Sequence, residues 1–363
     1  MQWSIGCKER QRDCDGITVT NPNPADAGSG AVVAAPFPEV PMVPISPWGQ
    51  GQPRFGDRVF RRLAQASGAL VVVLIVAIGG FLLMRAVPAL KRDQENFFTY
   101  GGPWVMTDTS AMHFGILGLL QVTIFVSLFA LVLAMPVALG VALFITQYAP
   151  RPIAGPLAYA IDLLAAVPSV IYGVWGLHVL APHVRPIASW LNHALGWCFL
   201  FADGNTSVTA GGTVLTGGLV LAVMILPITT AVTREVFVQT PFDQIEAALA
   251  LGATRWEVVR TTVLPFGRSG YVSGAMLGLG RALGETMALL VILRATRTVF
   301  GWSLFDGGST FATKIAGAAS DLDDPYRAGA YIAAGLVLFG ITFLIVALAR
   351  GAVAGIGRRR SGR

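Results

Sequence analysis

Residues 278–293 read GLGRALGETMALLVIL, an apolar stretch that carries two charges near its middle. A charge at the centre of a membrane helix costs roughly 2.5 to 3.5 kcal/mol on insertion scales. Arg281 and Glu285 are four residues apart, a spacing that places both side chains on one face of a helix, where they can pair. Gly274 and Gly278 fall on the same stripe and would let another helix approach closely. We therefore expect this face to look inward, away from lipid.

The whole chain has the composition of a membrane protein. Of its 363 residues, 54% are hydrophobic and 13% are charged, and the mean hydropathy is +0.64. Soluble domains carry about 25% charged residues, so a soluble fold of this size could not cover itself. The net charge of +6 comes from basic residues beside apolar stretches, which is typical of membrane proteins rather than of nucleic-acid-binding surfaces. The composition predicts an all-α polytopic membrane protein without a nucleic-acid partner.

Six apolar stretches come close to, or exceed, the roughly 20 residues that a membrane helix needs. They predict six transmembrane helices near residues 63–83, 114–146, 157–180, 212–238, 270–293 and 331–349. The second stretch is too long for one upright helix, so it is tilted, broken near Pro136 or extended beyond the membrane. Pro168 predicts a bend in the third stretch, because proline removes a backbone hydrogen bond.

The distribution of Lys and Arg sets the direction of these spans. Most of the 26 basic residues fall on the two termini and on the loops that would share their side of the membrane. The positive-inside rule therefore predicts that both termini are cytoplasmic. We predict a six-helix domain over residues 54–350 and a basic cytoplasmic tail over residues 351–363. Residues 1–53 are rich in Pro and Gly and predict a disordered cytoplasmic tail, unless the start codon was assigned too early.

The loop over residues 239–268 predicts two short helices on the cytoplasmic side. In the first, Thr240 is expected to cap the helix, with Pro241 at the first helical position and Asp243 three residues after the cap. Gly252 is expected to end this helix in the left-handed conformation.

The second short helix is expected to begin at Thr254, with Glu257 completing a capping box, and to end at Pro265. The two helices form a protruding elbow with small alanine side chains, where a partner could approach closely. The alternative is a surface hairpin that merely connects two spans.

The lettering of this loop resembles the EAA loop of the permease subunits of ABC importers. The residues that carry the resemblance are Glu246, Ala247, Ala248, Gly252, Leu264 and Pro265. In that family the loop is the coupling helix, which sits in a groove of the ATP-hydrolysing subunit. Thr262 departs from the pattern, which often has Ile at that position.

The chain itself carries no sign of catalytic chemistry. A phosphate-gripping loop needs glycines followed by Lys and Ser or Thr, and none of the three lysines follows such a loop. We therefore expect no enzyme activity and no cofactor, with ATP bound by a separate partner. No metal site is expected either, because no histidine lies near the cysteines that come closest to a zinc spacing, Cys7 and Cys14.

Residues 278–293 resemble the permeases of the phosphate (Pst) importer. Met287, which follows Gly-Glu-Thr, resembles the residue found there in the C-type (PstC-like) subunit. Residues 161–177, IDLLAAVPSVIYGVWGL, and residues 225–237, ILPITTAVTREVF, are similar to the same family. The resemblance covers about residues 60–350. It implies a multi-pass permease of the bacterial plasma membrane that forms half of a phosphate path. The implied partners are a homologous A-type permease, two copies of an ATPase subunit and an extracytoplasmic phosphate-binding protein.

Polar residues inside the spans are the candidates for the substrate path or gate. They are Arg281, Glu285, Asp162, Thr286, Ser169 and Tyr172. Arginine meets phosphate-like oxyanions with two parallel hydrogen bonds, so Arg281 is expected to handle the anion. The alternatives are a structural Arg281–Glu285 pair that fixes helix packing and a structural role for Asp162, where the family usually has Glu.

Three other functions stay open at this point. A permease for sulfate or molybdate belongs to the same class, and the GRALGET lettering argues for phosphate instead. A membrane sensor or scaffold could report phosphate supply through a cytoplasmic partner. An ion-driven carrier fits less well, because such folds usually contain inverted repeats and none is visible in this sequence.

Overall fold

The computed structural model describes residues 55–108, 111–206, 211–296, 299–318 and 321–358. The chain divides into the units Met1–Leu63 and Ala64–Arg363. The predicted N-terminal tail lies outside the described residues, as does the end of the predicted C-terminal tail. Within the described ranges the regular elements are helices, joined by loops that contain two isolated β-bridges. The all-α fold class predicted from the sequence is therefore confirmed.

Four helices in the described part of the chain are long and apolar enough to cross a membrane. They are α1 (Phe55–Leu90), α2 with its continuation η1 (together Leu117–Tyr148), α6 (Val214–Val238) and the first part of α12 (Pro325–Arg358). A fifth candidate is a bent run of helices in the third predicted span. The predicted count of six is not fully confirmed, since residues 270–293 contain two separate helices instead of one apolar span.

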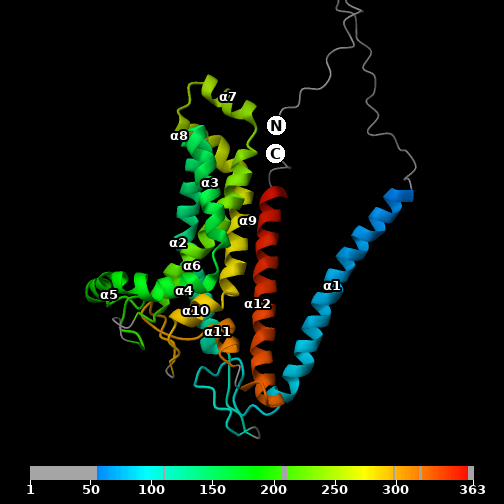
Figure 1. Cartoon of the computed structure of the whole chain (residues 1–363), viewed down its shortest axis with the longest axis vertical. Coiled ribbons are helices and arrows are strands. Elements are labelled where there is room, and N and C mark those ends of the chain that lie inside the picture. The colour runs from blue at the N-terminus through cyan, green and yellow to red at the C-terminus, as the bar shows by residue number, and fades with distance from the viewer. Residues whose placement is uncertain (1–54, 109–110, 207–210, 297–298, 319–320, 359–363) are drawn as a thin grey trace, which may run out of the picture. The chain divides into compact units, whose positions relative to one another are not determined.

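The core of the second unit is built around α6, the most buried of these helices (Figure 1). Helix α2 packs along α6, and α9 (Leu264–Leu283) packs along another of its faces. Glycines permit this approach, since a Cβ atom at Gly278 would lie 2.8 Å from Thr229 Oγ1. Gly274 and Gly278 are both buried, as expected for an inward-facing stripe, whereas Arg281 on the same stripe is exposed.

The third predicted span is bent by 91° at Pro168. Helix α3 (Arg151–Ala166) ends before the proline, and α4 (Ser169–Trp175), η2 (Gly176–Leu180) and α5 (Ala181–Leu195) follow it. Figure 1 shows α5 pointing away from the long helices. The Tyr172 hydroxyl donates a hydrogen bond of 2.8 Å to the Leu164 carbonyl and so satisfies a backbone group freed at the bend. The bend expected from Pro168 is confirmed.

Helices α1 and α12 meet at small residues. A Cβ atom at Gly329 would lie 3.1 Å from the carbonyl oxygen of Arg85 and 2.8 Å from Ala89 Cβ. Most of the apolar surface of α1 is exposed, with only 6% of its most apolar window buried. An apolar surface of this extent has to be covered by lipid or by another subunit. Helix α12 continues to Arg358, so the start of the predicted C-terminal tail is helical.

Short helices lie at the two ends of the long ones (Figure 1). At one end are α7 (Phe242–Ala250), α8 (Arg255–Val258) and the π-helical turn η4 (Val259–Val263). At the other end are α10 (Met287–Ile292) and α11 (Phe311–Ala316). The predicted coupling loop and the predicted outer loops are therefore separated by the length of the long helices.

Candidate functional site

The stretch that carries Arg281 and Glu285 is an interrupted helix. Helix α9 ends at Leu283, residues 284–286 are not helical, and α10 begins at Met287. The described residues Arg281 and Glu285 form no ion pair, so the predicted pairing is wrong. The four-residue spacing brings side chains together only within a continuous helix, and here the helix stops between them.

The interruption explains how this part of the chain accommodates two charges. Glu285 is only 8% exposed, and its Oε1 atom accepts a hydrogen bond of 3.1 Å from the Ala288 N–H in the first turn of α10. Arg281 lies in the last turn of α9. A helix N-terminus favours negative charge and a C-terminus favours positive charge. Each charge therefore sits at the helix end that stabilises it.

The interruption lies against α4, the helix after the bend. A Cβ atom at Gly173 would lie 2.9 Å from Ala288 Cα, so α4 and α10 are in close contact. The Arg281 guanidinium is close enough to act electrostatically on the Tyr172 phenol. Thr286 is half-buried at the start of α10, and its hydroxyl donates to the Gly284 carbonyl at 3.2 Å.

The six predicted path residues therefore fall into two groups. Arg281, Glu285 and Thr286 surround the interruption, beside the helix that begins with Ser169 and carries Tyr172 one turn later. Asp162 lies before the bend and makes a different contact. Its Oδ2 atom is 3.4 Å from Nη2 of Arg234, an ion pair that links α3 to α6.

Arg234 was not among the sequence-predicted site residues. It lies 72 residues from Asp162, and no local pattern connects positions so far apart. The pair is partly open to solvent, with the two side chains 22% (Arg234) and 48% (Asp162) exposed. This geometry matches the structural alternative for Asp162 better than a role in handling the anion.

We expect Asp162→Asn to have a small effect. Exposed ion pairs contribute about 0 to 1 kcal/mol, so the thermal stability of the purified complex should fall by no more than that amount. Substrate uptake should stay within about twofold of the unmodified protein, because a change of 0.4 kcal/mol in a barrier is about twofold. Arg234→Gln is the matched variant and should behave alike. A tenfold loss of uptake in Asp162→Asn at normal assembly would instead return Asp162 to the path.

The predicted coupling loop is exposed, as expected. Helix α7 has no buried side chain; Glu246 and Ala247 are exposed and Ala248 is half-buried. Gly252 has φ of +84°, so its predicted left-handed conformation is confirmed. The Thr254–Glu257 capping box is also confirmed. Glu257 Oε2 accepts from the Thr254 N–H at 2.7 Å, and Thr254 Oγ1 accepts from the Glu257 N–H at 3.3 Å.

Two details of this loop were predicted wrongly. Thr240 does not cap α7, because α7 starts one residue later than expected: Pro241 is its N-cap residue and Phe242 its first helical residue. The Thr240 hydroxyl makes no hydrogen bond among the described residues. Pro265 does not end the second helix. The chain runs from α8 through η4 into α9, and Pro265 lies in the first turn of α9, where a missing N–H is tolerated. Leu264 begins α9, so both residues belong to a long helix rather than to the loop.

Large apolar side chains around α7 were not singled out from the sequence. Leu251 is 90% exposed, Phe242 is 68% exposed and Trp256 is 57% exposed. The sequence did contain an indication of this surface, because large apolar residues are unexpected in a loop that was predicted to be exposed. Together with the alanines of α7 they give this end of the chain an apolar surface suited to contact with another protein.

Known proteins share sequence with most of this chain. The family model described as binding-protein-dependent transport system inner membrane component matches residues 134–357. The curated protein "Phosphate transport system permease protein PstC 2" of Mycobacterium tuberculosis is 57% identical over 302 residues, covering 83% of this chain and 93% of that protein. The PstC protein of Mycobacterium leprae is 57% identical over 294 residues, covering 81% and 92%.

A relative with lower sequence identity matches over a similar length of the chain. The PstC protein of Mesorhizobium japonicum is 36% identical over 299 residues, covering 81% of this chain and 89% of that protein. Among solved structures, an inward-facing form of the MetNI methionine ABC transporter gives a TM-score of 0.47 at 16% identity, covering 66% of this chain and 94% of that chain.

Proposed function

We propose that this chain, which belongs to the family of binding-protein-dependent transport system inner membrane components, is the C-type permease subunit of an ATP-driven phosphate importer. It is a multi-pass protein of the bacterial inner membrane, with both termini in the cytoplasm. It forms half of the translocation path, and a homologous A-type permease forms the other half. Two copies of an ATPase subunit bind and hydrolyse ATP, and an extracytoplasmic binding protein delivers phosphate.

The main support for this proposal is that the Arg281 guanidinium is free to bind an anion. Its side chain is exposed at the end of α9 and forms no ion pair in the described part of the chain. The carboxylate of Glu285 is occupied with the N-terminus of α10 and so leaves the guanidinium available. A guanidinium offers a planar pair of donors that matches the oxygens of a phosphate group. The relatives that share this chain's sequence are named phosphate transport permeases.

The coupling surface connects to Arg281 through helical structure. From Arg255 the chain runs through α8, η4 and α9 to Leu283 without leaving the helical conformation. Helix α7 begins four residues after the end of α6, the helix along which α9 packs. Movement of α7 in a groove of the ATPase would therefore be carried along α9 to the interruption, where the anion is handled.

Transport assays with all subunits in sealed vesicles test the proposal. Labelled phosphate should accumulate only when ATP and the binding protein are present on their respective sides. Sulfate and molybdate in place of phosphate test the alternative oxyanions. An assembled, ATP-hydrolysing complex that accumulates none of these anions would favour the sensor or scaffold function and reject the importer.

A further inference from the structure

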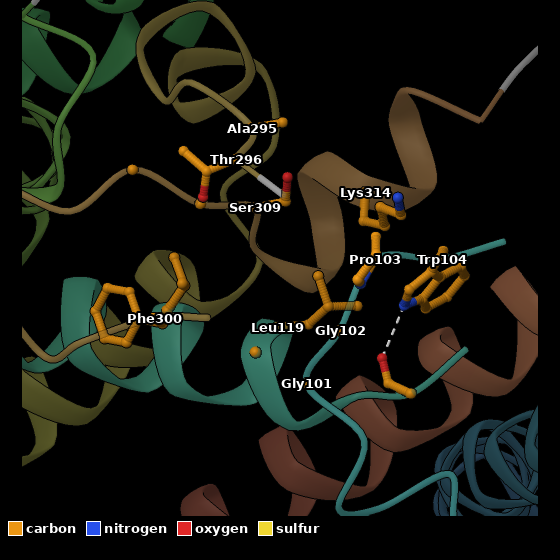
Figure 2. A pocket seen from close by; sticks show the side chains of 15 residues that line it. Gly101, Gly102, Pro103, Trp104, Leu119, Ala295, Thr296, Phe300, Ser309 and Lys314 are labelled. Carbon is orange, nitrogen blue, oxygen red and sulfur yellow. Dashed lines mark hydrogen bonds between the residues drawn. The ribbon is translucent and has the colours of Figure 1, made fainter. Parts of the chain in front are cut away.

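A small cavity lies beside α11, at the end of the long helices opposite α7 (Figure 1), and Figure 2 shows it from close by. Its volume is about 110 Å³, and its lining comes from residues 101–104, Gly115 and the start of α2, residues 295, 296, 300 and 307–309, and Lys314. A water molecule takes up about 30 Å³ of liquid, so the cavity has room for several waters or a small ion. Six lining residues are glycines, which bring backbone groups to the cavity surface: Gly101, Gly102, Gly115, Gly118, Gly307 and Gly308.

Lys314 of α11 supplies the positive charge of this cavity. Its Nζ atom lies 5.0 Å from the centre of the Trp104 ring, and it forms no ion pair with any described residue. Burial lowers the pKa of Lys314, and the negative charge of Asp321 opposes part of this shift. The Asp321 carboxylate itself accepts a hydrogen bond of 2.8 Å from the Tyr331 hydroxyl. No residue that lines the described cavity carries a negative charge.

Neutral donors line the same cavity. The N–H groups of Gly308 and Ser309 make no hydrogen bond within the described parts of the chain. The Thr296 hydroxyl accepts a hydrogen bond of 3.0 Å from Asn205 Nδ2, so its own hydrogen remains available to a ligand. Gly118 lies in the first turn of α2, a helix whose N-terminus has no side-chain cap. One ammonium and several unengaged N–H and O–H groups form a donor set suited to an oxyanion.

The wall made by residues 307–309 is held in place by contacts with neighbouring segments. The Gly307 N–H donates to Asn205 Oδ1 at 2.7 Å, and Asp306 Oδ1 accepts from the Asn205 N–H at 2.8 Å. Gly308 packs against α2, where a Cβ atom would lie 2.7 Å from Val122 Cγ2. The donors of Gly308 and Ser309 are therefore held in position before any ligand arrives.

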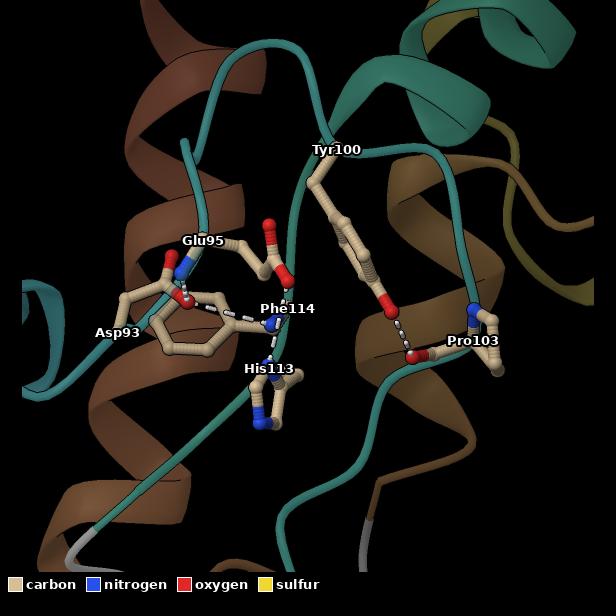
Figure 3. A network of polar contacts seen from close by, with 6 residues as sticks. All are labelled: Asp93, Glu95, Tyr100, Pro103, His113 and Phe114. Carbon is tan, nitrogen blue, oxygen red and sulfur yellow. Dashed lines mark hydrogen bonds and ion pairs between the residues drawn. The ribbon is translucent and has the colours of Figure 1, made fainter.

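The opposite wall is held by a network of polar contacts (Figure 3). The Tyr100 hydroxyl donates to the Pro103 carbonyl at 3.1 Å. In the same loop, which joins α1 to α2, Asp93 Oδ1 accepts a hydrogen bond of 3.4 Å from the Phe114 N–H. This contact ties the start of the loop to its end. The Trp104 indole N–H donates to the Gly115 carbonyl at 2.8 Å (Figure 2). These contacts fix the ring over which Lys314 lies.

We propose that this cavity is an outer anion-binding subsite, which takes a small oxyanion such as inorganic phosphate before the anion reaches Arg281. The identity of the anion and the outward position of the cavity rest on the proposed function. The chemistry itself, a partly buried ammonium beside free N–H groups, suits any phosphate group. A lipid headgroup is the other source of such a group, and the experiment below separates the two.

Chemical labelling of lysine amines tests the subsite directly. The chain has only three lysines, so peptide mass spectrometry can follow each one. In the assembled permease–ATPase complex in detergent, without binding protein, inorganic phosphate replaces chloride at constant ionic strength. Labelling of Lys314 should fall several-fold along a saturating curve, whereas exposed Lys91 should label equally throughout. Unchanged Lys314 labelling in a complex that still imports phosphate would overturn the subsite and leave the proposed function intact. Protection of Lys314 in a complex that imports no phosphate would support the subsite and reject the proposed function.

A second arm of the experiment identifies the source of the phosphate group. The labelling is repeated in phospholipid vesicles without added phosphate, where Lys314 should react as it does in detergent. Protection in the vesicles alone would show that a lipid headgroup fills the cavity and would reject the free-anion subsite.

Two variants connect the cavity to transport. Lys314→Met keeps an unbranched side chain of similar length but removes the charge. It should lower uptake at limiting phosphate about tenfold, the effect of one charged hydrogen bond. Lys314→Arg keeps the charge and should retain most of the uptake. Equal uptake by Lys314→Met and the unmodified protein would contradict a role for the subsite in import.

Discussion

Arg281→Gln should lower phosphate uptake by at least about tenfold, because a hydrogen bond to a charged group contributes about 1.5 to 3 kcal/mol and 1.4 kcal/mol is a factor of ten. Glutamine keeps the polarity and most of the length but removes the charge and the bidentate fork. Arg281 is exposed and forms no ion pair among the described residues, so its loss leaves no buried partner unpaired. The complex should therefore assemble normally. The measurement is ATP-driven uptake into vesicles, normalised to the amount of assembled complex.

Two further variants show whether the effect is specific. Arg268→Gln makes the same change near the other end of α9, at a residue that is also exposed, and should leave uptake close to normal. Arg281→Lys keeps the charge without the fork and should give an intermediate rate. Equal losses in Arg268→Gln and Arg281→Gln, or no loss in either, would contradict a role for Arg281 in handling the anion.

Gly252→Pro should abolish coupling between ATP hydrolysis and transport while the subunit remains in the membrane. Proline fixes φ near −65°, whereas Gly252 has φ of +84°, and its N–H donates to the Leu249 carbonyl at 2.9 Å. Proline is therefore excluded from the observed conformation, and the end of α7 has to change course. Insertion should be unaffected, because α7 buries none of its side chains. ATP hydrolysis and uptake, measured on the same vesicles, give the coupling ratio.

Gly252→Asn is the control for this change. A Cβ atom at this position meets nothing within 4 Å, and asparagine adopts the left-handed conformation more readily than other residues with a side chain. We expect this variant to keep most of the uptake. If Gly252→Pro transports phosphate normally, the loop is not the coupling element.

Features that depend on neighbouring residues in the sequence were predicted well. The apolar runs of α2, α6 and α12 identify these helices by length alone. Gly252 and the Thr254–Glu257 capping box belong to patterns no longer than four residues, and both are present. The bend at Pro168 follows from the missing N–H of one residue. In each case the physical cause lies within a few positions of the effect.

Features that depend on distant segments were predicted poorly. The interruption after Leu283 lies where α10 packs closely against α4, a segment far away in the chain, so the local pattern indicated a continuous helix. Lys314 drew no attention as a site residue, because its cavity is made by segments about 200 residues apart in the chain.

The glycines between α6 and α9 determine how this protein can transmit force. Helix α6 leads into the loop that carries α7, and α9 follows this loop. Both long helices are therefore connected to α7. They are pressed together near the loop, where a Cβ atom at Gly270 would collide with Val236, and again farther along at Gly278. We therefore expect a force on α7 to tilt α6 and α9 together rather than to separate them. A 20-residue helix such as α9 is about 30 Å long, so each degree of tilt moves its far end by roughly 0.5 Å. If the partner ATPase tilted these helices by about six degrees, Arg281 would move by roughly 3 Å, a distance comparable to a hydrogen bond.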